Sequence, residues 1–124
     1  MKPIHAPKAP AALGPYSAAM AFDKLVFLSG QTPIDPQTGA LAEEDIRVQT
    51  ERCIKNIAAV LEAAGSGFDK VIKTTCFLTD MANFAAFNEV YGQYFVSKPA
   101  RSTVAVLALP KNAMVEIEAI AYTD

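Results

Sequence analysis

The stretch IRVQTERCIKNIAAVLEAAGSGFDKVIKTTCFL, residues 46–78, decides the fold class because a helix signal is followed directly by a strand signal. Apolar residues recur with the helical period at positions 46, 50, 53, 54, 57, 58, 61 and 64, which predicts a helix over 46–64. Asp45 fits an N-cap and Gly65 a helix stop. Val71–Leu78 is rich in β-branched and aromatic residues, which predicts a strand.

Two short apolar runs precede this unit. Tyr16–Phe22 and Leu25–Ser29, separated by Asp23-Lys24, predict two strands joined by a tight hairpin. The turn-rich residues 32–39 then predict a loop. The proline-rich amino terminus holds His5, the only histidine, and is expected to be a mobile arm without a role in the site.

Three further elements follow the unit. Asp80 can cap a second helix with an aromatic stripe, which Pro99 prevents from continuing far. Ser102–Leu109 and Val115–Tyr122 predict the last two strands. The order is ββαβαββ, which predicts one α+β domain over residues 1–124, a mixed sheet with two helices on one face.

The composition is that of a folded protein without surplus positive charge. Of the 124 residues, 52% are hydrophobic and 19% are charged, unlike a disordered chain. The net charge of −2 argues against a nucleic-acid partner.

No apolar run is long enough to cross a bilayer, so no membrane partner is expected. Cys53 and Cys76 lack C-x-x-C spacing, which fits a reducing, cytoplasmic compartment, and no metal-ligand spacing is present.

Two predicted strands are apolar on both faces. In Ser102–Leu109, the valines at 104 and 106 alternate with Ala105, Leu107 and Leu109, and Leu25–Leu28 behaves likewise. Two helices can cover only one face of the sheet. We therefore predict a homo-oligomer, in which a second copy covers the other face and pockets form between subunits.

A few polar side chains interrupt these apolar patterns. Arg101 precedes the two-faced strand and offers a planar fork for a carboxylate, or for an ordinary salt bridge. Glu116 and Glu118 project from one face of the last strand. If this face is partly buried, a glutamate there can position water. If it is exposed, the two are ordinary solvated glutamates without a role. Asn88 lies on the apolar stripe of the second helix, where its amide must find partners. It is either a hydrogen-bonded core residue or a substrate contact. Gly30 allows close approach of a ligand to the backbone, or simply a turn.

Several segments together resemble the reactive-intermediate deaminase family, also called the YjgF family. Residues 9–17, APAALGPYS, are similar to its amino-terminal segment, and residues 29–39, SGQTPIDPQTG, to its S-G-Q-x-P-x-x-P-x-T-G stretch. PARS at 99–102 and VEIEA at 115–119 resemble its carboxy-terminal signature.

The resemblance implies a chorismate-mutase-like fold and a homotrimer with a central β-barrel and clefts between subunits. It also implies a cofactor-free 2-iminobutanoate/2-iminopropanoate deaminase, which hydrolyses 2-aminoacrylate and related enamines and imines to a 2-oxo acid and ammonia.

The resemblance also implies roles for the residues. Arg101 would clamp the substrate carboxylate and Glu116 would position or activate water. The implied lining of the pocket is Tyr16, Ser29, Gly30 and Asn88.

The chain departs from the family pattern in two places. Thr103 stands where many members carry cysteine, and only Val96-Ser97-Lys98 precedes the proline, where many have a longer segment with an aromatic residue. Two other functions stay open: a non-catalytic trimer that binds small carboxylates, and an endoribonuclease or translation inhibitor. The acidic balance and the single histidine speak against the ribonuclease.

Overall fold

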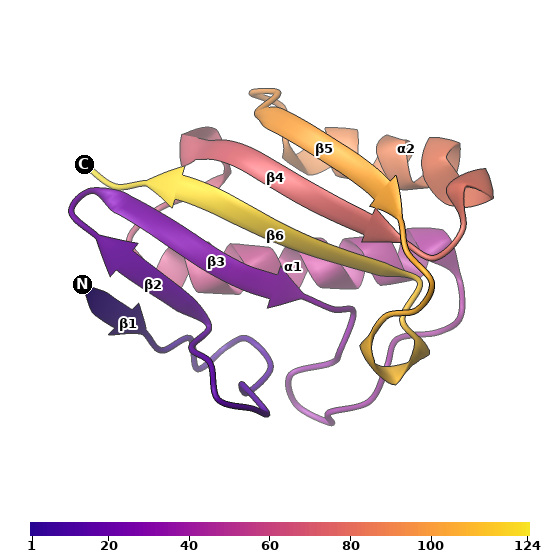
Figure 1. Ribbon diagram of the computed structural model, residues 1–124, viewed down its shortest axis with the longest axis horizontal. Coiled ribbons are helices and arrows are strands. Elements are labelled where there is room, and N and C mark those ends of the chain that lie inside the picture. Colours follow the sequence, from indigo (N-terminus) through magenta and orange to yellow (C-terminus); the bar gives the residue numbers. More distant parts are fainter.

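The computed structural model describes residues 1–124 as a six-stranded mixed sheet with two helices on one face (Figure 1). The strand order is β1-β2-β3-β6-β4-β5, with only the β4–β5 pair parallel. The elements are β1 Lys2–Ile4, β2 Ala19–Phe22, β3 Leu25–Gln31, α1 Ile46–Ala63, η1 Phe68–Lys70, β4 Val71–Leu78, η2 Met81–Asn83, α2 Phe84–Tyr94, β5 Ala100–Ala105, η3 Pro110–Asn112 and β6 Val115–Tyr122.

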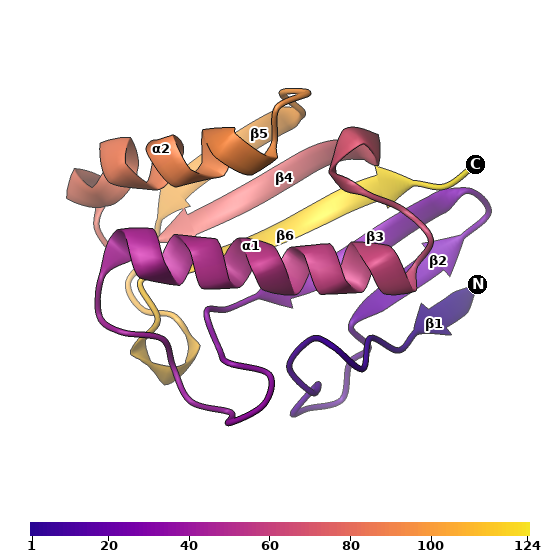
Figure 2. The same ribbon diagram turned by 180° about the vertical axis from the view of Figure 1, so that it is seen from behind.

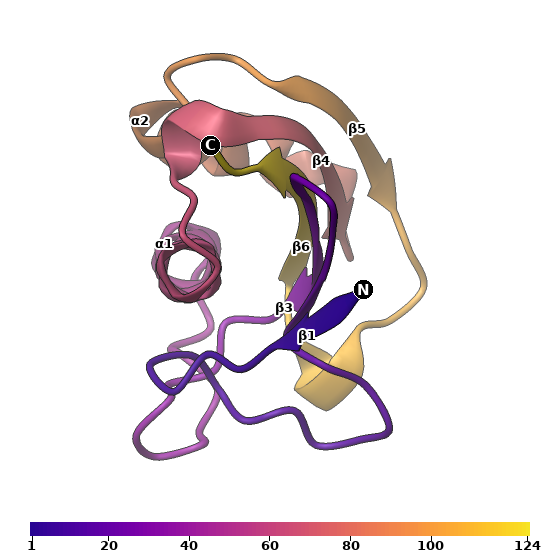
Figure 3. The ribbon, with the colours of Figure 1, turned by 90° about the vertical axis from the view of Figure 1, so that its left-hand side faces the viewer.

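The core lies between the sheet and the two helices. Figure 2 shows α1 and α2 in front of the sheet, and Figure 3 shows both on the same side of its curved surface. Ile54 and Ile57 of α1, Phe87 of α2 and Ile117 of β6 are completely buried in this layer. Each such side chain contributes about 1.5–3 kcal/mol to folding. The predicted α+β architecture with helices on one face is confirmed.

The helix ends follow the predicted signals. The Asp45 carboxylate accepts hydrogen bonds from the backbone N–H groups of Arg47 and Val48, at 2.9 and 3.2 Å. Gly65 adopts a φ of +76°, which suits glycine after a helix. Asp80 caps the short turn η2 by accepting from Ala82 N, so that α2 begins only after this turn.

The amino terminus corrects the predicted order. Instead of a mobile arm, Lys2–Ile4 forms a sixth strand that pairs antiparallel with β2. Three residues that include a proline are too short to show an alternating pattern. Proline is tolerated there because β1 is the edge of the sheet.

Two predicted strands are shorter in the structure. β2 starts at Ala19, because Tyr16 lies in a loop that the Ser29 backbone and side chain hold through hydrogen bonds to the carbonyls of Ala18 and Ser17. β5 ends at Ala105, since its only neighbour, β4, ends at Leu78.

The face of the sheet that carries no helix exposes several large apolar side chains to solvent in the isolated chain. Large side chains of β2, β3, β5 and β6 are exposed on it: Phe22, Leu25, Phe27, Val104 and Tyr122. We call these five residues the open apolar face. β5 is therefore an exposed edge strand in one chain rather than a strand buried on both sides. No helix is both long and apolar enough to cross a membrane.

Candidate functional site

The predicted site residues form two groups on opposite faces of the sheet. In β6, Ile117 and Ala119 are buried beneath the helices, so Glu116 and Glu118 project from the other face. Arg101 of β5 instead lies against α2. The structure brings Arg101 together with Asn88, and it brings Glu116 together with Tyr16, Ser29 and Gly30. A single chain does not bring Arg101 to Glu116.

The strand register explains this division. Arg101 is paired with Thr74 of β4, and Thr74 is paired with Ala119 of β6, both buried on the helix side. Glu116 is paired with Phe77 of β4, three residues along. An odd separation along a strand places side chains on opposite faces. The separation is thus a property of the sheet and not of a side-chain rotamer.

Arg101 is surrounded by one face of α2. Its Nη1 donates to Asn88 Oδ1 at 2.8 Å, and its Cζ lies 5.5, 5.7 and 4.8 Å from the ring centroids of Phe84, Phe87 and Tyr91. We call these four α2 residues the arginine cradle. Asn88 is thus a satisfied amide whose partner is Arg101, and it orients the guanidinium.

The charge of Arg101 has no anionic partner in the chain. The four salt bridges of the molecule join other residues. The cradle supplies aromatic faces and an amide oxygen, which stabilise a cation without neutralising it. A guanidinium that is not paired with an anion can bind a carboxylate through two parallel hydrogen bonds.

The second group lines a hollow of about 470 Å³ on the other face. Its lining consists of Tyr16, Ser29, Gly30, Thr32, Pro110, Glu116 and Glu118. We call it the glutamate hollow. It lies where the end of β3, the loop containing Tyr16 and the η3 turn meet β6.

A β-bulge at Ser29 and Gly30 shapes the glutamate hollow. Leu28 pairs with Ala119 and Gln31 with Ile117, so β3 has one more residue than β6 at this place. The Glu116 side chain lies directly over Gly30, and a Cβ there would come within 2.9 Å of Glu116 Cδ. Glycine is therefore required for the observed position of the carboxylate.

Burial raises the pKa of Glu116 above its ordinary value, and the nearby charge of Glu118 raises it further. Both causes disfavour the ionised form. A glutamate with a raised pKa accepts protons more readily near neutral pH, as a base that activates water must.

We expect Gly30→Ala to displace the Glu116 carboxylate while the fold is kept, because the flexible end of a side chain gives way before the backbone does. Activity should fall by at least about tenfold, given the sensitivity of catalysis to a displacement of 1 Å. Gly92→Ala in α2 is the matched control, since a Cβ there meets no atom within 4 Å. Equal activities of the two variants toward a 2-imino acid, the substrate class that the family resemblance implies, would show that the position of Glu116 is unimportant.

We expect Glu118→Gln to lower the pKa of Glu116, because it removes the neighbouring negative charge. Glu116 must be ionised to accept a proton, so the acidic limb of the pH profile of kcat/KM should move to lower pH. Burial is the larger cause of the raised pKa and remains in this variant, so the pKa of Glu116 should stay above that of an exposed glutamate. The exposed Glu44→Gln is the control and should leave the limb in place. An upward movement of the limb in Glu118→Gln would contradict this assignment.

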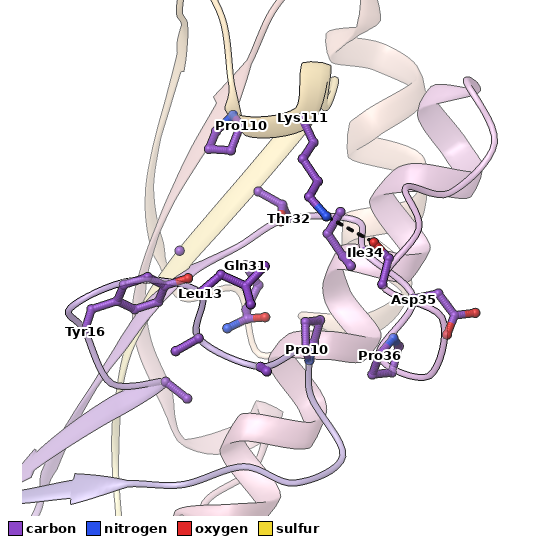
Figure 4. A pocket seen from close by; sticks show the side chains of 15 residues that line it. Pro10, Leu13, Tyr16, Gln31, Thr32, Ile34, Asp35, Pro36, Pro110 and Lys111 are labelled. Atoms are coloured by element: carbon purple, nitrogen blue, oxygen red, sulfur yellow. Dashed lines mark hydrogen bonds between the residues drawn. The ribbon is translucent and has the colours of Figure 1, made fainter.

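A second hollow of about 410 Å³ adjoins the first and shares Tyr16, Gly30, Thr32 and Pro110 with it. Figure 4 shows Lys111 reaching across it from η3 toward the loop that contains Asp35. The Lys111 Nζ donates to the carbonyl oxygen of Gly39 at 3.1 Å. This contact ties η3 to the turn-rich loop beside the glutamate hollow.

Buried polar side chains of α1 hold the same loop, a role that was not predicted from the sequence. Cys53 Sγ donates to the carbonyl of Gln31, and Asn56 Nδ2 donates to the carbonyls of Thr32 and Ile34 at 3.0 and 2.9 Å. Gln49 Nε2 donates to the carbonyl of Ala42. A signal existed, because amides on the buried stripe of a helix must find partners.

The two cysteines pack as small side chains in the core. Both are completely buried and unpaired. Burial raises the pKa of the Cys76 thiol to about 11 and that of Cys53 well above its ordinary value, so both stay protonated. Thr103, next to Cys76 in the register, has a buried hydroxyl oxygen without a hydrogen-bond partner. No cluster of three or more His, Cys, Asp or Glu side chains is placed to hold a metal ion.

Comparison with known proteins shows the family to which the chain belongs. A family model described as Endoribonuclease L-PSP matches residues 6–123. The mouse protein 2-iminobutanoate/2-iminopropanoate deaminase is 46% identical over 97% of this chain and 90% of its own. The Yersinia pestis protein YyfA, of the conserved Rid family, is 50% identical over 98% of both chains, with a TM-score of 0.96. The E. coli TdcF structure with bound serine is 41% identical over all of both chains, with a TM-score of 0.95. The chain therefore belongs to the reactive-intermediate deaminase family, the YjgF/RidA family.

Proposed function

We propose that this protein is a cofactor-free deaminase that hydrolyses 2-aminoacrylate and related enamines and imines to a 2-oxo acid and ammonia. The observation that carries the proposal is the guanidinium of Arg101, held by the arginine cradle and without an anion of its own. The deaminase name of the mouse relative and the serine bound to TdcF support it, since serine carries the same carboxylate beside a nitrogen-bearing carbon.

The site would be completed by a second copy of the chain. Arg101 and Glu116 lie on opposite faces of one sheet, so a substrate that meets both must lie between two copies. The open apolar face gives the copies a surface on which to associate. We propose a homotrimer in which the arginine cradle of one copy faces the glutamate hollow of the next.

The reaction needs little more than orientation of the substrate and one proton shuttle. Arg101 binds the carboxylate of the protonated imine, and Glu116 takes a proton from water as the water oxygen bonds to C2. Glu116 then gives this proton to the nitrogen of the tetrahedral intermediate. The C–N bond breaks and ammonia leaves, and Glu116 takes the hydroxyl proton as the C=O bond forms and then passes it to solvent. General acid–base help of this kind supplies about a hundred- to ten-thousandfold.

An enamine substrate first becomes the protonated imine by gaining a proton at C3 as the C=N bond forms. The imine already hydrolyses in water, so the protein has to accelerate an existing reaction. Positioning between Arg101 and Glu116 adds to the effect of the proton shuttle.

The assay that tests the proposal produces 2-aminoacrylate in situ with a dehydratase acting on serine. Addition of this protein should accelerate pyruvate and ammonia release beyond the spontaneous rate. Binding of pyruvate without acceleration, seen as thermal stabilisation, would instead indicate a carboxylate-binding protein that does no chemistry. Cleavage of RNA by highly purified protein, weakened by salt, would favour the function in the family model's description.

We expect Phe27→Glu to disrupt the oligomer, because Phe27 is 42% exposed on the open apolar face and a buried carboxylate at an interface is costly. Val48→Glu is the matched control. Val48 is 39% exposed on α1, in the helix layer, and its substitution should leave the oligomer intact. Analytical ultracentrifugation measures both. A Phe27→Glu protein with the mass of the unmodified assembly would place the interface elsewhere.

A further inference from the structure

The aromatic stripe of α2 surrounds a cation as well as packing against the sheet. Phe84, Phe87, Asn88 and Tyr91 follow the spacing i, i+3, i+4 and i+7 of one helix face, and all four contact Arg101. The same spacing predicts an ordinary core stripe from sequence. One face of α2 is therefore built around a single guanidinium.

The Tyr91 ring is the nearest of the three, at 4.8 Å from Arg101 Cζ. Guanidinium groups stack on aromatic faces, which restricts the plane in which their N–H groups lie. A side-chain carboxylate in the same place would also hold the arginine, but it would occupy the donors that an external carboxylate needs. Tyr91 can fix the guanidinium and leave its charge available.

The Tyr91 ring is itself held from several sides. Its hydroxyl lies 2.6 Å from the hydroxyl of Thr74, the residue paired with Arg101 in the neighbouring strand. Its ring stacks on Phe95 with centroids 4.3 Å apart, and it lies 5.5 Å from Phe87. Tyr91 is buried. Because these contacts fix the Tyr91 ring, the ring sets the orientation of the guanidinium.

We propose that Tyr91 is a positioning residue, which sets the plane of the Arg101 guanidinium so that its donors meet the substrate carboxylate in one orientation. The inference depends on Arg101 being the carboxylate anchor of the proposed function. It adds that the anchor binds the carboxylate most tightly when a fixed aromatic ring orients it. The ring performs this role, and the hydroxyl secures the ring through Thr74.

The test compares the affinity for pyruvate, a stable 2-oxo acid, in matched variants of the full chain. Tyr91→Leu removes the ring and should weaken pyruvate binding by about tenfold, within the range of a partly desolvated cation–π contact. The value of kcat at saturating substrate should change by less than about twofold, because a weaker cation–π contact affects binding. Tyr91→Phe restores the ring and should bind within about twofold of the unmodified protein, because the aromatic face is kept.

Phe68→Leu is the control for loss of an aromatic side chain from the same cluster. Phe68 packs edge-on against Phe95 at 5.1 Å but makes no contact with Arg101. Its substitution should leave pyruvate affinity unchanged. If Tyr91→Leu does not fold, Phe84→Leu replaces it, since Phe84 is only half-buried and its ring also lies over Arg101.

A second measurement needs no ligand. In the NMR spectrum, the aromatic rings are expected to shift the Arg101 Nε–H signal. This shift should become smaller in Tyr91→Leu, which keeps the Phe84 and Phe87 rings, and should persist in Tyr91→Phe. Unchanged pyruvate affinity and an unchanged Arg101 signal in Tyr91→Leu would overturn the inference. Weakened binding in Tyr91→Leu by a protein that accelerates no hydrolysis would support the positioning role and reject the deaminase. If Arg101→Ala binds pyruvate normally, the anchor and the role of Tyr91 both fail.

Discussion

Arg101→Ala is expected to lower kcat/KM for 2-aminoacrylate by about a hundred- to a thousandfold. The substitution removes two charge-assisted hydrogen bonds to the substrate carboxylate, which together are worth about 3–4 kcal/mol. Arg101→Lys should recover little of the lost kcat/KM. An ammonium group cannot stack flat on the aromatic rings of the cradle while it donates two parallel hydrogen bonds to a carboxylate. The coupled dehydratase assay measures both variants.

Arg47→Ala is the matched control for this loss. Arg47 is an exposed arginine of α1 that already pairs with Glu89. Its removal should leave kcat/KM within about twofold, since exposed ion pairs contribute little. Equal rates for Arg101→Ala and Arg47→Ala would remove the basis of the proposed function.

Glu116→Gln is expected to lower kcat by about a hundred- to ten-thousandfold, the range that general acid–base catalysis supplies. The amide has the shape of the carboxylate and fits over Gly30, but it cannot accept a proton from water. Pyruvate affinity should change little, because Arg101 makes the carboxylate contact. Single-turnover rates and pyruvate titration separate these two effects.

Glu118→Gln is the control for Glu116→Gln, since both glutamates line the glutamate hollow and only Glu116 lies over Gly30. The Glu118 variant should retain most of its rate at neutral pH. A Glu116→Gln protein that keeps full kcat would mean that water is activated by another group.

The elements with a clear internal pattern were predictable from the sequence. The bounds of β4 and β6 agree with the predicted strands, and α1 ends one residue before the predicted end. These segments combine regular periodicity with strong end signals, such as Asp45 and Gly65. β1 was missed because it is held by pairing with β2 and has no pattern of its own.

The site was only partly predictable for a related reason. Alternation along one strand places Glu116 and Glu118 on a common face, and this prediction is confirmed. The opposite placement of Arg101 depends on the register of β5 against β4 and of β4 against β6. Pairings between strands distant in sequence are not encoded in local periodicity.

The cradle shows a second limit of sequence patterns. The α2 stripe predicts a buried helix face, and Phe87 and Tyr91 are indeed buried. Periodicity does not say which partner such a face meets. Here the partner includes Arg101, a cation on the adjacent edge strand, which the structure alone reveals.

Mixing two inactive variants tests the two-copy site most directly. Arg101→Ala and Glu116→Gln subunits are denatured together, refolded in equal amounts and assayed with 2-aminoacrylate. If each site takes its arginine from one copy and its glutamate from the next, about a quarter of the sites in random assemblies contain both native residues. The mixture should then recover about a quarter of the unmodified rate, whereas each variant refolded alone stays inactive. A mixture as inactive as its components would contradict a site shared between copies.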